Sequence, residues 1–153
     1  MSHPLHPLLV HFPIALLYTT VLFEVLGYLL KKEALRQTAL WLLSLGLAGG
    51  VVAAIAGEWG EEFAEAAGVP EAAIDRHETF AILSLVAFGI LLVFRLWRGR
   101  GWIPQNEAVY FAIAMVGLLL LGTAGFFGGE LVYRYGAGVE RPASQPAGPS
   151  SSR

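Results

Sequence analysis

The chain has 153 residues, of which 56% are hydrophobic and only 14% are charged, and its formal net charge is −2. Because an average soluble domain is about a quarter charged, this composition is that of an integral membrane protein. The absence of cysteine excludes disulfides, thiolate metal sites, iron–sulfur clusters on this chain and covalent c-type haem attachment. The small net charge gives no reason to expect a nucleic-acid partner.

Four apolar segments, taken in chain order, are long enough for membrane-spanning helices. They cover about residues 8–30, 38–57, 74–97 and 107–129. A membrane-spanning helix needs about 20 apolar residues, and a helix satisfies its own backbone groups in lipid. The third segment reaches this length if its helix begins before Thr79, near Ile74 or Pro70. The sequence therefore predicts an all-α fold, a four-helix transmembrane bundle within a membrane domain of residues 1–139.

Two segments outside the four spans have distinctive compositions. GEWGEEFAEAAGVP, between spans two and three, carries Trp59 and Phe63 among glutamates, which predicts a short interfacial helix with its aromatic rings toward lipid. RPASQPAGPSSSR, at the end of the sequence, is rich in Pro, Ser, Ala and Gly, so we expect residues 140–153 to form a disordered tail. No internal repeat is evident.

Charged residues are divided unequally between the two ends of the predicted bundle. Six basic residues lie in or near the loops after spans one and three: Lys31, Lys32, Arg36, Arg95, Arg98 and Arg100. The positive-inside rule places these loops in the cytoplasm, so we expect a multi-pass protein of the bacterial plasma (inner) membrane with both termini on the outer, periplasmic side. Most acidic residues then lie outside, where they keep that face soluble or attract a basic soluble cytochrome.

Two histidines are expected at matched depth near the outer edge of the apolar layer. His11 lies about two turns into a helix that starts at one of the N-terminal prolines, and His77 lies about two turns into a helix that starts near Pro70. Ionisable residues at such depth are candidates for function, although either residue could instead cap a neighbour's backbone or face the headgroups. His6 could replace His11 as a ligand, although it lies nearer to water.

Small residues are concentrated in the outer halves of spans two and four. They allow close helix packing, and beside two inward-facing histidines they also leave room for a flat group such as a porphyrin. We therefore expect a b-type haem whose iron takes His11 and His77 as axial ligands. The glycines expected around the porphyrin are Gly50, Gly57, Gly125 and Gly129.

Two residues inside span one are unusual for a helix in lipid. Pro13 would remove the bond to the carbonyl of Leu9 and kink the segment, which would aim His11 inward, unless it still belongs to the first turns, where proline is tolerated. Glu24 is the one carboxylate within a span. It would relay protons, or hold the register of the bundle by bonding a hydroxyl such as that of Ser44.

Two other functions are compatible with these residues. A copper or zinc site formed by three histidines and Glu58 is a second chemical interpretation. A third is a structural or assembly subunit without a cofactor, which packs through its glycine faces in an oligomer or a larger membrane complex. An enzyme is not expected, because the sequence defines no nucleophile–base pair, phosphate loop or substrate cavity.

Four stretches of the chain resemble a known family. The opening HPLHPLLVHFPIALL, the acidic residue in FEVLG, the histidine in RHETFAIL and the closing GGELVYRYGAGV are similar to the integral membrane family called domain of unknown function 2231. The likeness runs from about His6 to Val139 and implies a four-helix membrane protein without an assigned activity. His6, His11, Glu24 and His77 occupy matching positions. Some members resemble this chain fused to Rieske-type or cytochrome-c-type domains, which implies an electron-transfer setting and a separate redox partner for this chain.

Overall fold

The computed structural model describes residues 5–66, 68–101 and 106–139. Within these ranges the chain forms helices and no strand: α1 (Leu5–Leu9), α2 (His11–Leu29), α3 (Glu33–Ala66), α4 (Glu71–Gly99) and α5 (Glu107–Tyr133). Helices α2, α3, α4 and α5 are each long and apolar enough to cross a membrane. The predicted all-α fold with four spans is confirmed. The tail expected at residues 140–153 lies outside the described residues.

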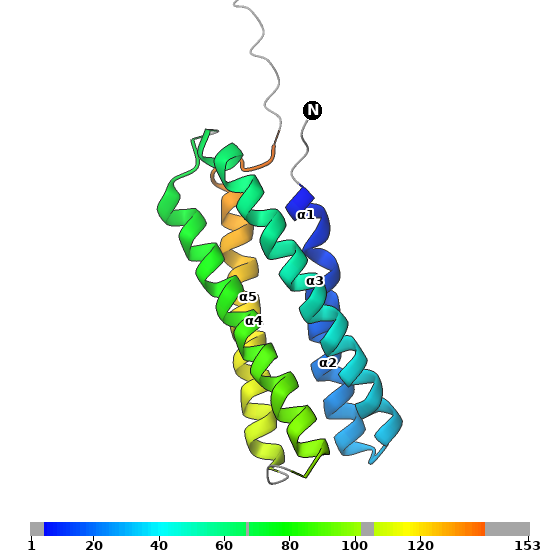
Figure 1. The fold of residues 1–153 in the computed structure, drawn as a ribbon. Coiled ribbons are helices and arrows are strands. Elements are labelled where there is room, and N and C mark those ends of the chain that lie inside the picture. The colour runs from blue at the N-terminus through cyan, green and yellow to red at the C-terminus, as the bar shows by residue number, and fades with distance from the viewer. Residues whose placement is uncertain (1–4, 67, 102–105, 140–153) are drawn as a thin grey trace, which may run out of the picture.

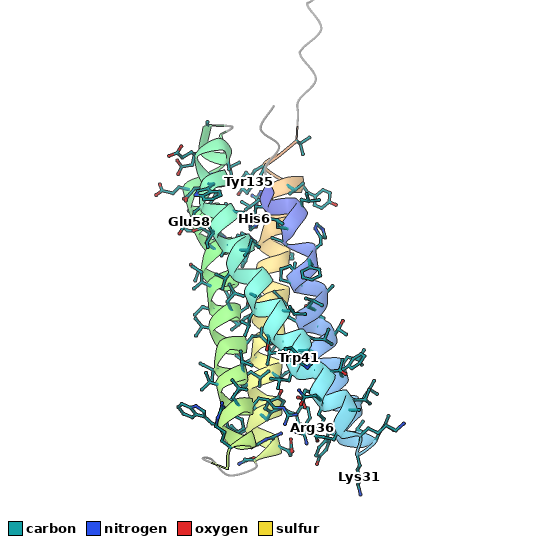
Figure 2. All side chains as sticks on the ribbon, turned by 45° about the vertical axis from the view of Figure 1, so that its right-hand side comes forward. His6, Lys31, Arg36, Trp41, Glu58 and Tyr135 are labelled. Atoms are coloured by element: carbon teal, nitrogen blue, oxygen red, sulfur yellow. The ribbon has the colours of Figure 1, made fainter. Side chains whose placement is uncertain are left out.

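The long helices form an antiparallel bundle of two hairpins, α2 with α3 and α4 with α5, and α1 continues the line of α2 (Figure 1). Both ends of the described chain lie at the same end of the bundle, beside the α3–α4 connection. We call this the histidine end, because His6 and His77 lie there. The opposite end, where Arg36, Arg95 and Arg98 lie, is the arginine end. Figure 2 shows His6 at one end of the bundle and Arg36 at the other.

A one-residue interruption at Val10 separates α1 from α2. Pro13 has no N–H to offer to the carbonyl of Leu9, so one helical hydrogen bond is missing there. The neighbouring bonds are kept: the N–H of Val10 donates to the carbonyl of His6 at 3.1 Å, and that of Ile14 donates to the carbonyl of Val10 at 3.2 Å. Val10 itself has helical angles, φ −64° and ψ −30°. Side chains therefore keep an approximately helical period from α1 into α2.

Helix α3 is longer than a membrane requires. Its 34 residues make a rod of about 50 Å at ~1.5 Å per residue, against about 30 Å for the hydrocarbon layer. The separate interfacial helix expected between spans two and three does not form, because the segment of residues 58–66 is rich in Glu and Ala and continues α3. Trp59 on this extension is 71% exposed. The helix ends just before Gly68, which has φ +88°, and Pro70 then caps α4.

The apolar core lies along the middle of the bundle and is drawn from all four long helices. Its buried members are Leu17, Val21, Leu43, Phe88, Leu91, Tyr110, Ala114 and Leu121. The two helices of each hairpin approach closely at a glycine. A Cβ added to Gly46 would lie 2.9 Å from Leu17, and one added to Gly117 would lie 3.1 Å from Phe88. The glycines thus serve the close helix packing expected of small residues in membrane bundles.

Candidate functional site

Two histidines touch each other at the histidine end, His6 from α1 and His77 from α4. Their ring centroids are 5.9 Å apart and the ring planes are at 88°. Nδ1 of His6 lies 2.7 Å from the carbonyl oxygen of Ala53 on α3. Nδ1 of His77 lies 2.9 Å from the carbonyl oxygen of Ala124 on α5. Because a carbonyl only accepts, Nδ1 carries the proton in each neutral imidazole, and Nε2 keeps its lone pair.

Two glycines leave the space that the imidazoles occupy. A Cβ added to Gly57 would lie 3.1 Å from Nδ1 of His6, and one added to Gly128 would lie 3.1 Å from Nδ1 of His77. Each glycine follows the bonded alanine by one helical turn. Since helical side chains lean toward the N-terminus, any side chain at these positions would cover the carbonyl that the histidine bonds.

The glycines expected around a porphyrin do not surround the histidine pair. Of those four, Gly57 contacts a histidine ring, whereas a Cβ on Gly50 would meet Leu85 of α4 at 2.5 Å in a helix-packing contact. Gly125 and Gly129 have no atom within 4 Å of an added Cβ. They line a shallow hollow on the outside of α5 with the exposed Phe126. Two members of the expected set, Gly125 and Gly129, therefore lie away from the histidine pair.

His11 lies on a different face of the helix from His6. Its side chain is exposed, while Pro13 is buried, so the proline does not aim His11 inward. The two histidines are five positions apart, and at 3.6 residues per turn this places their side chains about 140° apart around the helix. The ring that the structure shows against His77 is that of His6. The predicted pair of His11 with His77 is thus corrected to His6 with His77, the alternative that the sequence left open.

The helical period is the signal that identifies His6. His6 shares one face with Pro13, Leu17, Thr20 and Glu24, which follow it at steps of seven, four, three and four residues. All four of those residues are buried. Depth in the membrane favours His11 as the partner of His77, whereas His6 is the histidine that lies on the helix face pointing into the bundle.

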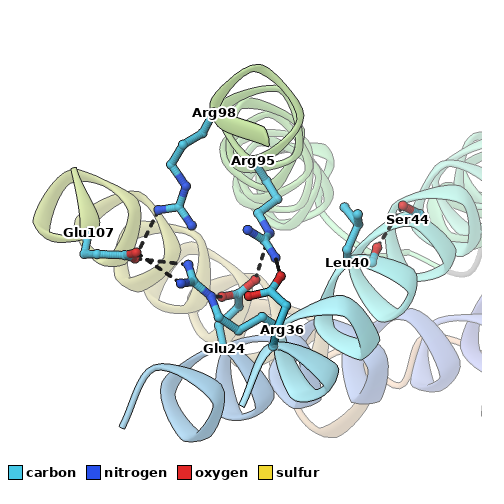
Figure 3. A network of polar contacts seen from close by, with 8 residues as sticks. Glu24, Arg36, Leu40, Ser44, Arg95, Arg98 and Glu107 are labelled. Atoms are coloured by element: carbon cyan, nitrogen blue, oxygen red, sulfur yellow. Dashed lines mark hydrogen bonds and ion pairs between the residues drawn. The ribbon is translucent and has the colours of Figure 1, made fainter. Parts of the chain in front are cut away.

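A series of alternating charges joins the four long helices at the arginine end (Figure 3). Its members, in order of contact, are Glu33, Arg95, Glu24, Arg36, Glu107 and Arg98. Glu24 is 1% exposed and lies 3.2 Å from Arg36 of α3 and 3.4 Å from Arg95 of α4. Three arginines balance three glutamates, which is the condition under which buried charges are tolerated.

Glu24 bonds arginines and not Ser44, whose hydroxyl donates to the carbonyl of Leu40 at 2.9 Å. The expected hydroxyl partner is therefore wrong. Arg36 and Arg95 were counted with the cytoplasmic loops, yet their side chains are only 14% and 11% exposed. The Glu24–Arg36 contact could have been predicted from the sequence. The two residues lie at nearly equal distances from the turn that joins α2 and α3, so an antiparallel hairpin brings them together.

No group of three or more His, Asp or Glu side chains that could hold a metal ion occurs in the part of the chain that the structure describes. The copper or zinc set expected from three histidines and Glu58 is therefore not assembled by the described residues. Of the four histidines in the sequence, His3 lies outside the described residues.

Comparison with known proteins agrees with this architecture. The model of the family described as "Predicted membrane protein (DUF2231)" matches residues 2–141. The chain belongs to the DUF2231 family. No curated protein and no solved structure matches it. The resemblance carried by HPLHPLLVHFPIALL and GGELVYRYGAGV is thereby confirmed, and the four candidate spans of this DUF2231 chain imply contact with membrane lipid.

Proposed function

We propose that this DUF2231 protein is a non-enzymatic electron-transfer subunit in which His6 and His77 are the axial ligands of a b-type haem. The observation that supports this is the hydrogen bonding of the two rings: each Nδ1 is bonded to a backbone carbonyl, which leaves the lone pair of each neutral imidazole on Nε2. Histidines that bind metals almost always donate their other ring N–H in this way, which fixes tautomer and orientation. When bound, a haem with two imidazole ligands supplies a one-electron carrier.

The separation of the two imidazole rings is compatible with one metal ion held by both. If two metal–nitrogen bonds of about 2.0 Å lay in line, the ring centroids would be about 6 Å apart. The observed centroid separation is 5.9 Å. The proposal rests on these two nitrogen donors and not on the glycines, because the space beside Gly57 and Gly128 is occupied by the imidazole rings themselves.

Charge supports an orientation with the histidine end in the periplasm. Lys31, Lys32 and Arg100 are exposed at the arginine end, as the positive-inside rule requires of a cytoplasmic face. The histidine end carries exposed acidic side chains, among them Glu58, Glu62, Glu65, Glu71 and Asp75. This face would attract a basic soluble cytochrome or a Rieske-type or cytochrome-c-type partner.

The test is a visible absorption spectrum of the full-length protein, purified in detergent from haem-replete cells, before and after dithionite. We expect a sharp Soret band and, on reduction, resolved α and β bands. His6→Ala and His77→Ala should each lose the haem, while His11→Ala, at an exposed position on a different helix face, should retain it. A colourless wild-type protein with full helix content would overturn the haem assignment.

A second candidate, a structural subunit without a cofactor, is favoured by the same two hydrogen bonds. Each one links two helices, His6 to α3 and His77 to α5, and such bonds help helices associate in lipid. Asparagine can donate to the same carbonyls but is a poor haem ligand. His6→Asn and His77→Asn should therefore match the thermal stability of a colourless wild type if the histidines are structural, and should lose bound haem if they are ligands.

A further inference from the structure

The contacts of the two histidines repeat each other position by position. Both histidine–carbonyl bonds span 47 residues of sequence. In each case the ring also lies against the glycine one turn after the bonded alanine. The second set of residues follows the first by a constant 71 positions, the difference between 77 and 6: His6 and His77, Ala53 and Ala124, Gly57 and Gly128.

The same offset of 71 positions relates the glycine contacts of the two hairpins in the middle of the bundle. Gly46 has Leu17 against it, and Gly117, 71 positions later, has Phe88 against it. Leu17 and Phe88 are themselves 71 positions apart, and both are buried in the core. The helix crossing within the first hairpin is thus reproduced in the second.

At the arginine end, the offset pairs residues of opposite charge that touch each other. Glu24 corresponds to Arg95, and their side chains lie 3.4 Å apart. Arg36 corresponds to Glu107, and these lie 3.2 Å apart. Two identical charges facing each other would repel, so equivalent positions in contact can both be ionised only if their signs differ.

Equivalent positions of two related halves touch each other where they lie on the axis that relates the halves. His6 and His77 meet this condition at the histidine end. The pairs Glu24–Arg95 and Arg36–Glu107 meet it at the arginine end. The axis therefore runs along the bundle, as it does in membrane proteins built from parallel repeats.

We infer that the chain is a tandem duplication of one helical hairpin, and that the two histidines on its pseudo-two-fold axis are equivalent ligands of a single centre. Each is held in the Nδ1–H tautomer by a carbonyl of its own hairpin, with Gly57 and Gly128 as positioning residues. The centre is one that accepts a neutral imidazole from each half. That it is haem iron rests on the function proposed above, whereas the duplication and the tautomers do not.

The test is nitrogen-15 NMR of the full-length protein in detergent, with labelled histidine and without haem. The chain has four histidines, so single His→Gln variants assign the signals. We expect both His6 and His77 in the Nδ1–H tautomer, which is the minor form of free histidine in water.

Matched alanine variants then test the equivalence. Gly57→Ala should shift the signals of His6 more than those of His77, and Gly128→Ala should do the reverse, with changes of the same sign and similar size. Both follow from the added Cβ lying 3.1 Å from the ring. Gly125→Ala is the control, since its Cβ would have no atom within 4 Å. One equivalent of added hemin should then perturb both histidines together.

The outcomes separate this inference from the haem assignment. Different tautomers for His6 and His77, or a His77 that does not respond to Gly128→Ala, would overturn the equivalence whatever the protein binds. If the tautomers and the responses to the alanine variants match but the histidine signals do not change when hemin is added, the duplication would be supported and the haem assignment overturned.

Discussion

At the scale of single residues, a helix carbonyl bonds a second donor only where nothing covers it. The carbonyl oxygen has two lone pairs, one of which serves the helix itself, so the other is open to an imidazole from a neighbouring helix. The residue one turn later decides whether the imidazole can approach. Ala53 and Ala124 are bonded by histidines because Gly57 and Gly128 follow them. A histidine that lies on a buried helix face, opposite such a glycine, is therefore a better candidate for an inward-facing ligand than a histidine chosen by its depth in the membrane alone.

Glu24 gives the sharpest prediction for one side chain at the arginine end. Glu24→Gln should destabilise the protein by ~3–5 kcal/mol, because Arg36 and Arg95 would remain buried without a carboxylate between them. Thermal unfolding in detergent, followed by circular dichroism, measures the loss. Glu33→Gln is the control: Glu33 is 76% exposed, so its ion pair with Arg95 should contribute at most about 1 kcal/mol. Equal losses in both variants would show that Glu24 does not carry the network.

At the scale of helices, apolar length predicted the four spans well and their ends poorly. Length works because lipid requires about 20 apolar residues in each span. Apolar length gives no information on where a helix stops outside the lipid, so it predicts a separate helix over residues 58–66, the polar end of α3. Its Glu and Ala residues favour helix regardless of lipid, and the chain turns only at Gly68 and Pro70.

Helix crossings depend on Gly117 in a way that a matched glycine can test. Gly117→Ala should destabilise the bundle by ~1–3 kcal/mol, because the new Cβ would lie 3.1 Å from the buried ring of Phe88 and would overpack the crossing. Gly89→Ala, in the middle of α4 with open space around it, should be neutral or stabilise by up to about 1 kcal/mol through helix propensity. Unfolding temperatures of the two variants relative to wild type provide the measurement. Similar losses in both would mean that the close approach at Gly117 does not limit packing.

At the scale of the whole molecule, composition predicted a membrane bundle, but the duplication could not be seen in the sequence. The two halves keep the same residue mainly where helices meet, at positions such as Gly46 and Gly117, and these are scattered along the chain. Where the halves face each other with charges, the signs are reversed. A comparison of residue types therefore scores Glu24 against Arg95 as a mismatch, although contact across an axis explains it.

The orientation of the molecule in the membrane follows from the positions of its basic residues. Arginines that end in the buried network still count toward orientation, because the positive-inside rule counts basic residues within about 15–20 residues of the span ends. All six basic residues near the arginine end therefore favour the cytoplasm. The chain has no cysteine, so single cysteines can report sidedness: Glu65→Cys at the histidine end and Lys31→Cys at the arginine end, both at exposed positions. In intact spheroplasts, a membrane-impermeant maleimide should label Glu65→Cys at once and Lys31→Cys only after lysis. Labelling of Lys31→Cys in intact spheroplasts would show the opposite orientation, with the acidic face and the histidine pair on the cytoplasmic side.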